Sequence, residues 1–457
     1  MFSRLGITTI SIGIRSVLIE LYGRERKIEM QDNKKYPITR RDFLATGAVA
    51  ATAVSGFPFV NTSRAQRVKP LKVGLIGCGG RGTASLREAL QAEPGIRVIA
   101  LADPFKDRIE QCLKSLKDPR RMKGLIQGVD VKPDRCFAGL DGYRKLLETE
   151  VDWVNLVGPP GLRPRHFEAA VEAGKNVFLE KPVATDPAGV RKILRTAKRA
   201  KEKGLSVVVG FDNRHNPGRI EAVKRIHGGA IGQITSGTSY NYTRWTRWFR
   251  GDDPSWTEME YQCRNWYYFC WLSGDVIVEQ SIHTIDVTNW VMGAYPINAL
   301  GQGGRQLPLD PRRGNVWDHM MVDYEYPDGV HIIHMDRQWP NCHGSGRAGF
   351  IGTEGKYTGN EITGRNPWKF SGELERSGVY EQRTMIESIR KEKPKSQAEN
   401  GAYAALTAIM GRESAYTGRL ITWDEMLNSN LDLFPKKMEF GPVPRRAVPI
   451  PGRPRPL

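Results

Sequence analysis

Three glycines near residue 80 have the spacing of a loop that holds phosphate. Gly77, Gly79 and Gly82 follow the pattern G-x-G-x-x-G, after the apolar residues 71–76 and before the helical "TASLREAL". In such a loop the first glycine permits a tight turn, the second lets the backbone approach a pyrophosphate, and the third lets helix and strand pack closely. The helix N-terminus adds free N–H groups and a partial positive charge. We therefore expect a strand, loop and helix that bind a dinucleotide.

A carboxylate follows this loop at a distance that suits ribose recognition. The segment "IRVIALAD" ends in Asp103, 26 positions after Gly77. An acid about 20 positions on is expected to accept a hydrogen bond from the ribose 2′-hydroxyl. The same carboxylate repels a 2′-phosphate, which favours NAD over NADP even with Lys106 and Arg108 nearby. The alternative is a glycine-rich turn without a ligand, and the flanking strand and helix disfavour it.

The elements that must position these residues alternate along the chain. "VDWVNLVGPP", "KNVFLEKP" and "SVVVGF" are predicted as buried strands, with helices "RPRHFEAAVEAG" and "DPAGVRKILRTAKRAKEKG" between them. Apolar strands alternating with helices predict an α/β fold with a doubly wound parallel sheet. Ligands of such sheets bind beyond the carboxyl ends of the strands. This rule places residues 158–160, 180–182 and 213–215 around one crevice.

Several segments resemble one known family. "AGKNVFLEKPVATD" resembles the strand-end segment of the glucose–fructose oxidoreductase/inositol dehydrogenase (Gfo/Idh/MocA) family, and "KVGLIGCGGRG" resembles its opening. "GAIGQITSGTSYNY", "IGTEGK" and "AYTGRLITW" resemble later landmarks, so the resemblance spans about residues 70–425. It implies an N-terminal Rossmann domain and a C-terminal α/β domain with a large, open, mostly antiparallel sheet. One face of that sheet would cover the nicotinamide, and the other often meets a partner subunit, which implies a homo-oligomer (dimer or tetramer).

The resemblance also implies a catalytic group made of the lysine of E-K-P and the acid and histidine of D-x-x-x-H. Lys181 matches the lysine and His283 the histidine, whereas Glu279 stands where the family has aspartate. One helix through "SGDVIVEQSIHTIDVTNWVMG" would place Glu279 and His283 on the same face, because i and i+4 are neighbours. His283 is then the expected base, Lys181 would stabilise the oxyanion or relay the proton, and Asp286 would orient His283. The alternatives are a core histidine and a plain strand-end lysine.

The remaining site predictions extend this arrangement. The expected cofactor contacts are Gly77, Gly79, Gly80, Arg81, Gly82, Asp103, Gly158, Pro159, His166, Glu180 and Lys181. The expected substrate contacts are Arg214, Trp245, Asp286 and His319. Aromatic residues and arginines crowd residues 240–271, either as core packing or as a sugar-binding wall, and both interpretations stay open. No metal site is predicted, because His331 and His334 would face opposite sides of a strand.

The N-terminal segment has the features of an export signal. Arg40 and Arg41 precede a short run rich in alanine, and residues 63–65 (Ser-Arg-Ala) offer a cleavage site. This pattern predicts a twin-arginine leader over residues 1–65, with Met30 as the expected true start, and a periplasmic or otherwise exported protein. The alternative is a first helix of the folded domain. The apolar run is shorter than the about 20 residues that span a bilayer, so no integral membrane segment is expected in the mature chain.

Composition and length set the remaining expectations. The mature chain is expected to hold a Rossmann domain (66–215), a substrate and oligomerisation domain (216–435) and a Pro/Arg-rich tail (436–457) that is disordered or an extended arm. The formal net charge of +18 fits a basic soluble enzyme or one with an anionic substrate. Nucleic acid is disfavoured, because the sequence contains no recognised module that reads it.

These patterns favour an NAD-dependent oxidoreductase that acts on a hydroxyl of a sugar, cyclitol or related carbohydrate. One alternative is a glycosidase that retains NAD and cleaves by transient oxidation and elimination. Another is a non-catalytic sugar-binding scaffold, which only Glu279 in place of aspartate favours. A folded chain that crosses the membrane with NAD already bound would explain a twin-arginine leader on a dinucleotide-binding protein.

Overall fold

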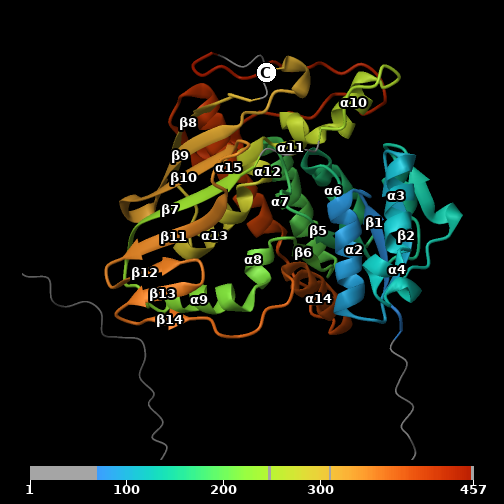
Figure 1. The fold of residues 1–457 in the computed structure, drawn as a ribbon, viewed down its shortest axis with the longest axis horizontal. Helices are drawn as coiled ribbons and strands as arrows, with labels where there is room; N and C mark the ends of the chain where they lie inside the picture. Colours follow the sequence, from blue (N-terminus) through green and yellow to red (C-terminus); the bar gives the residue numbers. More distant parts are fainter. Residues whose placement is uncertain (1–68, 245–248, 308–309, 454–457) are drawn as a thin grey trace, which may run out of the picture. The chain divides into compact units, whose positions relative to one another are not determined.

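The computed structural model describes residues 69–244, 249–307 and 310–453. The predicted leader, residues 1–65, and the predicted substrate contact Trp245 lie outside the described residues. The described residues form two β-sheets with helices packed on both (Figure 1). Within these ranges, every helix is too short or too polar to cross a bilayer.

The first sheet has six described strands, all parallel, in the order β3-β2-β1-β4-β5-β6. Its central strands are buried along their whole length because helices cover both faces, as in other parallel sheets. The strand order reverses between β1 and β4, which is where such sheets bind ligands. The predicted doubly wound sheet is confirmed. The strands are β1 Lys72–Ile76, β2 Arg97–Asp103, β3 Cys136–Ala138, β4 Trp153–Leu156, β5 Asn176–Leu179 and β6 Val207–Val209.

Helices link these strands and position their carboxyl ends. Helix α2 starts inside the glycine loop, and α14, from the C-terminal part of the chain, returns to pack against α2. The C-terminal half of the chain therefore contributes a helix to the first sheet's layer. The helices around this sheet are α2 Gly80–Ala92, α3 Lys106–Leu116, α4 Pro119–Met122, α5 Gly142–Leu147, α6 Arg163–Glu172, α7 Pro187–Glu202 and α14 Ser377–Arg390.

The second sheet has nine described strands in the order β14-β13-β12-β11-β7-β10-β9-β8-β15. Neighbouring strands are antiparallel except for β7 and β10, so the predicted mostly antiparallel sheet is confirmed. The strands are β7 Ile234–Thr243, β8 Asn298–Gly304, β9 His319–Tyr326, β10 Val330–Gln338, β11 Ser345–Gly352, β12 Gly355–Thr358, β13 Glu361–Gly364, β14 Trp368–Lys369 and β15 Ile421–Thr422.

One face of this sheet is buried and the other is open. Every second residue of β9, from Met320 to Tyr326, is buried, and α13 and α15 pack against this inner face (Figure 1). The outer face includes exposed apolar side chains, among them Leu300, Met321 and Ile351. The helices of this half are α8 Asp212–His215, α9 Pro217–His227, α10 Glu258–Arg264, α11 Cys270–Ser273, α12 Val276–Glu279, α13 Ile282–Met292, α15 Ala398–Thr417 and α16 Trp423–Asn428.

The segment predicted as one helix through Glu279 and His283 is two helices. Helix α12 ends at Glu279 and α13 begins at Ile282, with Gln280 and Ser281 between them. Asp275, with a positive φ of 75°, begins α12 by accepting a hydrogen bond from the backbone N–H of Val276 at 2.5 Å. The single-helix prediction is therefore wrong, because this cap and the break at residues 280–281 redirect the chain.

Within the described residues, the Pro/Arg-rich tail forms neither helix nor strand. It runs over α10, the yellow-green helix near the red tail at the top of Figure 1. The backbone N–H of Met259 donates to the carbonyl of Gly441 at 3.0 Å, and Arg445 Nε donates to Glu258 Oε1 at 2.6 Å. Of the two predicted possibilities, the structure has the extended arm, and it lies on the chain's own surface.

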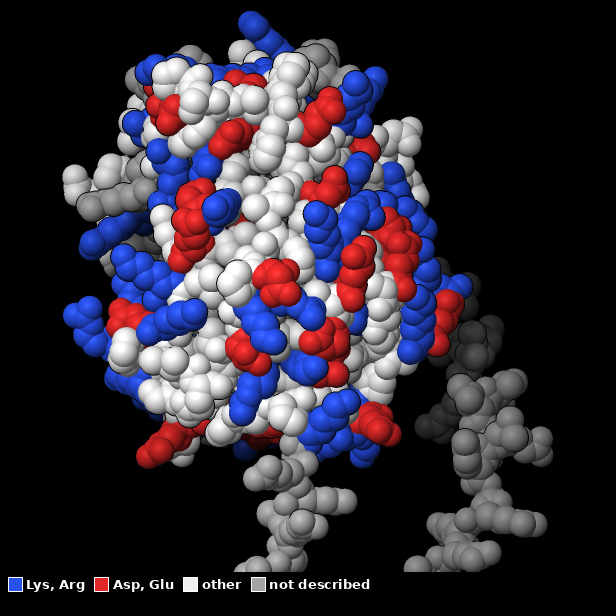
Figure 2. All heavy atoms as spheres, turned by 90° about the vertical axis from the view of Figure 1, so that its right-hand side faces the viewer, with Lys and Arg blue, Asp and Glu red and all other residues white. Residues whose placement is uncertain are grey.

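The strongly basic composition does not produce one continuous basic surface on the face drawn in Figure 2. Basic and acidic side chains are interspersed there. This face lies over the first sheet's helices on the right-hand side of Figure 1. On this face, the distribution of charge gives no support to a polyanion as the partner.

Candidate functional site

A cavity of about 750 Å³ opens beyond the carboxyl ends of the first sheet's strands. All three predicted catalytic residues line it, together with every predicted cofactor contact except His166. These are Gly77, Gly79, Gly80, Arg81, Gly82, Asp103, Gly158, Pro159, Glu180, Lys181, Glu279 and His283. The glycine loop, Lys181 about 100 positions later and His283 about 200 positions later in the sequence therefore share one space.

The glycine loop has the geometry that a bound pyrophosphate needs. Gly77 has a φ of +105°, and a Cβ there would collide with the backbone nitrogen of Gly158. A Cβ at Gly82 would collide with the carbonyl oxygen of Gly77. A Cβ at Gly79 would meet nothing within 4 Å, although Gly79 lines the cavity. The first and third glycines are thus required by the backbone, and the second faces open space at the uncapped N-terminus of α2.

Asp103 is held at the end of β2 by two backbone hydrogen bonds. Its Oδ1 accepts from the N–H of Phe105 at 2.9 Å and its Oδ2 from the N–H of Cys78 at 2.8 Å. Burial raises the pKa of Asp103 to about 6, in spite of these two bonds. The group is therefore mainly ionised at neutral pH. Each oxygen keeps a free lone pair with which it can accept a hydrogen bond from a ribose hydroxyl.

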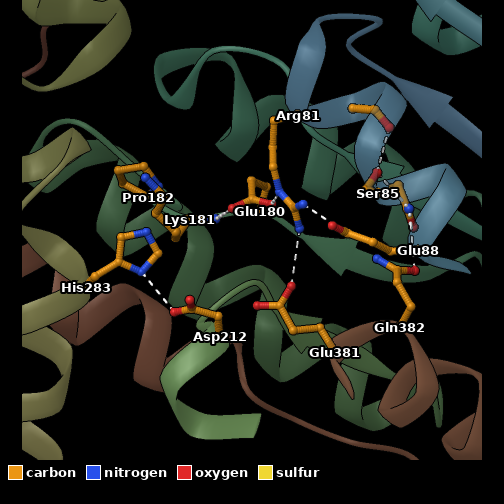
Figure 3. Close-up of polar contacts among 12 residues, drawn as sticks. Arg81, Ser85, Glu88, Glu180, Lys181, Pro182, Asp212, His283, Glu381 and Gln382 are labelled. Carbon is orange, nitrogen blue, oxygen red and sulfur yellow. Dashed lines mark hydrogen bonds and ion pairs between the residues drawn. The ribbon is translucent and has the colours of Figure 1, made fainter. Parts of the chain in front are cut away.

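Arg81 joins the glycine loop to two distant elements (Figure 3). Its guanidinium donates to Glu180 at 2.8 Å, to Glu88 at 2.7 Å and to Glu381 of α14 at 3.2 Å. Burial raises the pKa of Glu381 well above its usual range, and the charge of Glu180 adds to the effect. This cluster fixes Glu180, and with it the strand end that carries the next residue, Lys181.

The Lys181 ammonium group is anchored by the end of α12. Its Nζ donates to the carbonyl oxygen of Glu279 at 2.6 Å and to Glu279 Oε1 at 3.2 Å. Both side chains are about nine-tenths buried. The following residue, Pro182, is held by the buried guanidinium of Arg163, which donates to its carbonyl and to that of Gly158. Glu279 therefore positions Lys181, and Arg163 ties together the two strand ends beside it.

His283 has a carboxylate at its Nδ1. Asp212 Oδ1, just beyond β6, lies 3.3 Å from this nitrogen, close enough for an ion pair but without an aligned hydrogen bond (Figure 3). Burial acts to raise the pKa of Asp212, but the neighbouring His283 outweighs it and holds the value at about 2. The carboxylate is thus ionised at every working pH, and it leaves Nε2 of His283 as the atom that can exchange a proton.

The predicted partner of His283 was wrong. Asp286 is fully buried and pairs with Arg214, whose Nε lies 2.8 Å from its Oδ2. Neither Arg214 nor Asp286 is among the described residues that line the cavity, so both predicted substrate contacts are corrected. The physical reason is that a buried carboxylate needs a counterion, and Arg214 satisfies it while Asp212 occupies the place beside His283.

Two further predicted residues lie elsewhere. His319 Nδ1 and Asp318 Oδ1 share a hydrogen bond of 2.7 Å, and the imidazole ring packs on Trp339. His319 is not among the described residues that line the cavity. His166 is buried against Tyr143 and borders a separate cavity of about 70 Å³ next to Asp103. Burial and nearby arginines lower the pKa of His166 to about 3, so it is neutral. Neither histidine is among the described residues that line the larger cavity, and their predicted ligand contacts stay predictions.

Sequence reasoning missed several residues of the site. Asp212 stands one position before the predicted 213–215 segment, and only the turn after β6 decides which of these residues faces the cavity.

The residues of the aromatic stretch, 240–271, fall into two groups that match the two interpretations left open, core packing and a wall of the cavity. Tyr261, Tyr267, Tyr268 and Trp271 are buried in the core, whereas Trp266, Arg250 and Arg264 line the cavity. The clustering of arginines with aromatics was the signal that pointed to them.

Comparison with known proteins identifies the family. The model of the oxidoreductase family with an NAD-binding Rossmann fold matches residues 71–211. The model of the GFO/IDH/MocA C-terminal domain matches residues 220–358. The chain belongs to the Gfo/Idh/MocA family. The predicted family membership is thereby confirmed.

Relatives within the Gfo/Idh/MocA family carry different names. A protein of Bacillus subtilis named scyllo-inositol 2-dehydrogenase (NAD(+)) is 26% identical over 62% of this chain and 72% of its own length. A Glycosyl hydrolase family 109 protein of Streptomyces coelicolor is 27% identical over 42% of each chain. The crystal structure of aldose-aldose oxidoreductase from Caulobacter crescentus, at 18% identity, aligns with a TM-score of 0.59 over 78% of this chain and 99% of that one. This last likeness shows the shared fold.

The cavity of this Gfo/Idh/MocA chain fits NAD. The open space at Gly79, the uncapped start of α2 and the oriented Asp103 supply places for the pyrophosphate and a ribose. Lys181 and His283 lie in the same cavity, where a nicotinamide and a substrate would meet. The predicted cofactor, NAD, is therefore supported by the family and by the residues themselves.

Proposed function

We propose that this protein is an NAD-dependent oxidoreductase that acts on a hydroxyl group of a sugar, cyclitol or related carbohydrate. The observation that carries the proposal is that Lys181 and His283 line the same cavity as the glycine loop and Asp103. The names of relatives support the substrate class, since one is an NAD-dependent inositol dehydrogenase.

NAD, held by the glycine loop and Asp103, would supply the hydride acceptor for the carbon that bears the hydroxyl group. The hydroxyl proton must leave as the hydride does, so a base must reach that oxygen. Nε2 of His283 takes this proton, and the Asp212 carboxylate stabilises the imidazolium that results. Lys181 donates a hydrogen bond to the oxygen as negative charge develops there. Glu279, bonded to Lys181 at 3.2 Å, keeps the ammonium group in place.

A second candidate function is glycoside cleavage by transient oxidation. The observation that favours it is the relative named Glycosyl hydrolase family 109 protein. Oxidation of a ring hydroxyl to a ketone would acidify the neighbouring C–H, so loss of that proton could expel the glycosidic oxygen by elimination. Water would then add to the resulting enone, and return of the hydride to the ketone would give the free sugar and restore NAD. Product analysis separates the two functions. A stable keto-sugar with one NADH per turnover indicates a dehydrogenase, and a released sugar without net NADH indicates a glycosidase.

The catalytic assignment is tested with a matched pair of histidine variants. His283→Ala removes the proposed base, and His331→Ala removes an exposed histidine of β10 that pairs with Asp323. With NAD and a panel of cyclitols and sugars, we expect His283→Ala to lower kcat by about 10²–10⁴ while NAD binding persists, and His331→Ala to resemble wild type. Full activity of His283→Ala would overturn the assignment. A wild-type protein that binds NAD and sugar without turnover would instead be a scaffold.

Two properties of the whole protein, export and oligomeric state, complete the proposal. Arg40-Arg41 and the run after them support export by the twin-arginine route, and the site's fit to NAD supports export with the cofactor already bound. The exposed apolar residues Leu300, Met321 and Ile351 on the outer face of the second sheet support a homo-oligomer built on that face. Fractionation of cells, with and without substitution of both arginines by lysine, tests the first property.

A further inference from the structure

The C-terminal arm, residues 436–453, reaches the residues that line the NAD cavity. The ring of Phe440 stacks on that of Phe105, with centroids 5.9 Å apart and planes 27° from parallel. Phe105 comes two residues after Asp103 and lines the cavity. Met438 of the arm borders the smaller cavity that Asp103 and Pro104 also line. The arm thus runs along the segment that follows the ribose-binding carboxylate.

Phe105 is also held from the second half of the chain. The guanidinium of Arg264, at the end of α10, lies 3.9 Å from the centroid of the Phe105 ring. Arg264 pairs with Asp107 of α3 at 3.2 Å and with Glu260 at 2.9 Å. Arg264 itself lines the cavity. Phe105 therefore contacts the arm through Phe440 and α10 through Arg264.

The arm is fastened to α10 at several points. Arg445 pairs with Glu258 at 2.6 Å, and its guanidinium lies 4.7 Å from the ring centroid of Tyr261. The carbonyl of Gly441 accepts from the N–H of Met259, as described above. Farther along, Trp317 Nε1 donates to the carbonyl of Pro449 at 3.1 Å. The arm is anchored at Gly441, Arg445 and Pro449, all after Phe440, so its position over Phe105 is fixed by more than one contact.

This arrangement has a consequence for the cofactor. Asp103 marks the end of the cavity where the adenosine ribose would lie, and Phe105 and Arg264 form part of the wall at that end. A dinucleotide bound at this end would lie against Phe105 and Arg264. Phe440 packs on Phe105 and Arg445 holds the arm on α10, so both contacts oppose movement of this part of the wall.

We propose that the C-terminal arm is a functional part of the NAD site, in which Phe440 and Arg445 hold Phe105 and α10 against the adenosine end and slow release of the cofactor. The proposal rests on the proposed function, because it takes NAD as the occupant of the cavity. Phe440 and Arg445 act as positioning residues, since neither lines the cavity itself. The expected result of losing either contact is faster dissociation of NAD with little change in the chemical step.

The test measures the rate of NAD release from loaded, full-length mature protein. The variants are Phe440→Ala, Arg445→Ala and, as the matched control, Lys437→Ala, whose side chain is 84% exposed on the same arm. Release is followed after rapid mixing with an enzyme that consumes free NAD. We expect Phe440→Ala and Arg445→Ala to release NAD about three- to tenfold faster than wild type, and Lys437→Ala to match it. The thermal unfolding midpoint without NAD checks that the variants fold.

A charge exchange makes the test specific to the arm–α10 contact. Glu258→Arg should speed release as Arg445→Ala does, and the double variant Glu258→Arg/Arg445→Glu should restore slow release. One outcome would overturn the arm's role alone. The wild type would bind and use NAD, while Phe440→Ala and a chain that ends at residue 435 would both release NAD at the wild-type rate. A wild type that releases NAD slowly but oxidises no carbohydrate would contradict the proposed function and leave the arm's role unchanged. A wild type that binds no NAD would overturn both.

Discussion

The pKa of a single carboxyl group should control NAD affinity. Burial raises the pKa of Asp103 to about 6, and only the ionised group can accept hydrogen bonds from the ribose with both oxygens. As the pH falls through 6, Asp103 takes up a proton that NAD binding must remove. We expect the Kd for NAD to be constant above pH 7 and to rise by up to about tenfold per pH unit below pH 6, measured by calorimetric titration.

The matched variant for this prediction is Asp103→Asn, which has no charge to lose. Its NAD affinity should be lower than that of wild type at pH 7.5 and independent of pH between 5 and 8. A wild-type affinity that stays constant down to pH 5 would mean that the Asp103 carboxylate makes no contact with the bound nucleotide.

A second residue, Asp212, should act through His283. Its carboxylate, 3.3 Å from Nδ1, stabilises the imidazolium that forms when His283 accepts a proton. In Asp212→Asn that charge is lost, so we expect kcat to fall about tenfold or more and the acid limb of kcat/KM to move to lower pH, with the Kd for NAD unchanged. The control is Asp323→Asn, which removes the carboxylate beside the exposed His331. An Asp212→Asn enzyme with a wild-type pH profile would remove Asp212 from the mechanism.

At the scale of elements, the loop between β1 and α2 contains one glycine that serves NAD binding and another that serves folding. A Cβ at Gly79 meets no protein atom within 4 Å, whereas one at Gly82 meets the carbonyl of Gly77. We expect Gly79→Ala to keep the unfolding midpoint of the NAD-free protein and to weaken NAD binding at least about tenfold. Gly82→Ala should lower the midpoint itself. Gly228→Ala, at the end of α9, is the control, because its Cβ would make only ordinary contacts. Wild-type NAD affinity in Gly79→Ala would contradict the placement of the pyrophosphate.

The elements also show which features the sequence could predict. The glycine loop, Asp103 and the strand ends at Gly158 and Lys181 were predictable because local patterns determine them: apolar strands, turn glycines and the parallel-sheet rule. The break between α12 and α13 was not, because Ser281 within it donates its hydroxyl to Asp336 Oδ2 at 2.9 Å, 55 residues away. Periodicity alone carries no information about such a distant partner.

The pairing of charged residues was the other part that sequence could not decide. The sequence places four charged residues in segments expected around the cavity, but it allows several pairings among them. These residues are Arg214, Asp286, Asp212 and His283. The choice depends on burial: Asp286 is fully buried and takes the guanidinium, and Asp212 is left to His283. The place of His166 depends on burial as well, since Tyr143 packs on it, whereas His319 is partly exposed and pairs with its own neighbour Asp318.

At the scale of the whole molecule, the outer face of the second sheet should join subunits. Leu300 of β8 and Met321 of β9 are 52% and 41% exposed on that face. If this face is a subunit interface, two lysines placed there would be desolvated without partners. We expect Leu300→Lys/Met321→Lys to convert an oligomer to monomer in light scattering after size exclusion. Leu420→Lys, at a site 55% exposed outside that sheet, is the control. An oligomer that survives the double substitution would place the interface elsewhere.

The central claim, that the cavity beyond the first sheet holds NAD for reaction at Lys181 and His283, is tested most directly by the nucleotide itself. Mature protein purified from its producing cells without added cofactor is denatured, and the supernatant is assayed for NAD(H). Any protein found empty is then titrated with NAD. We predict close to one NAD(H) per chain in the purified protein, retained behind the C-terminal arm. Protein that carries no nucleotide and also binds none on titration would contradict the account.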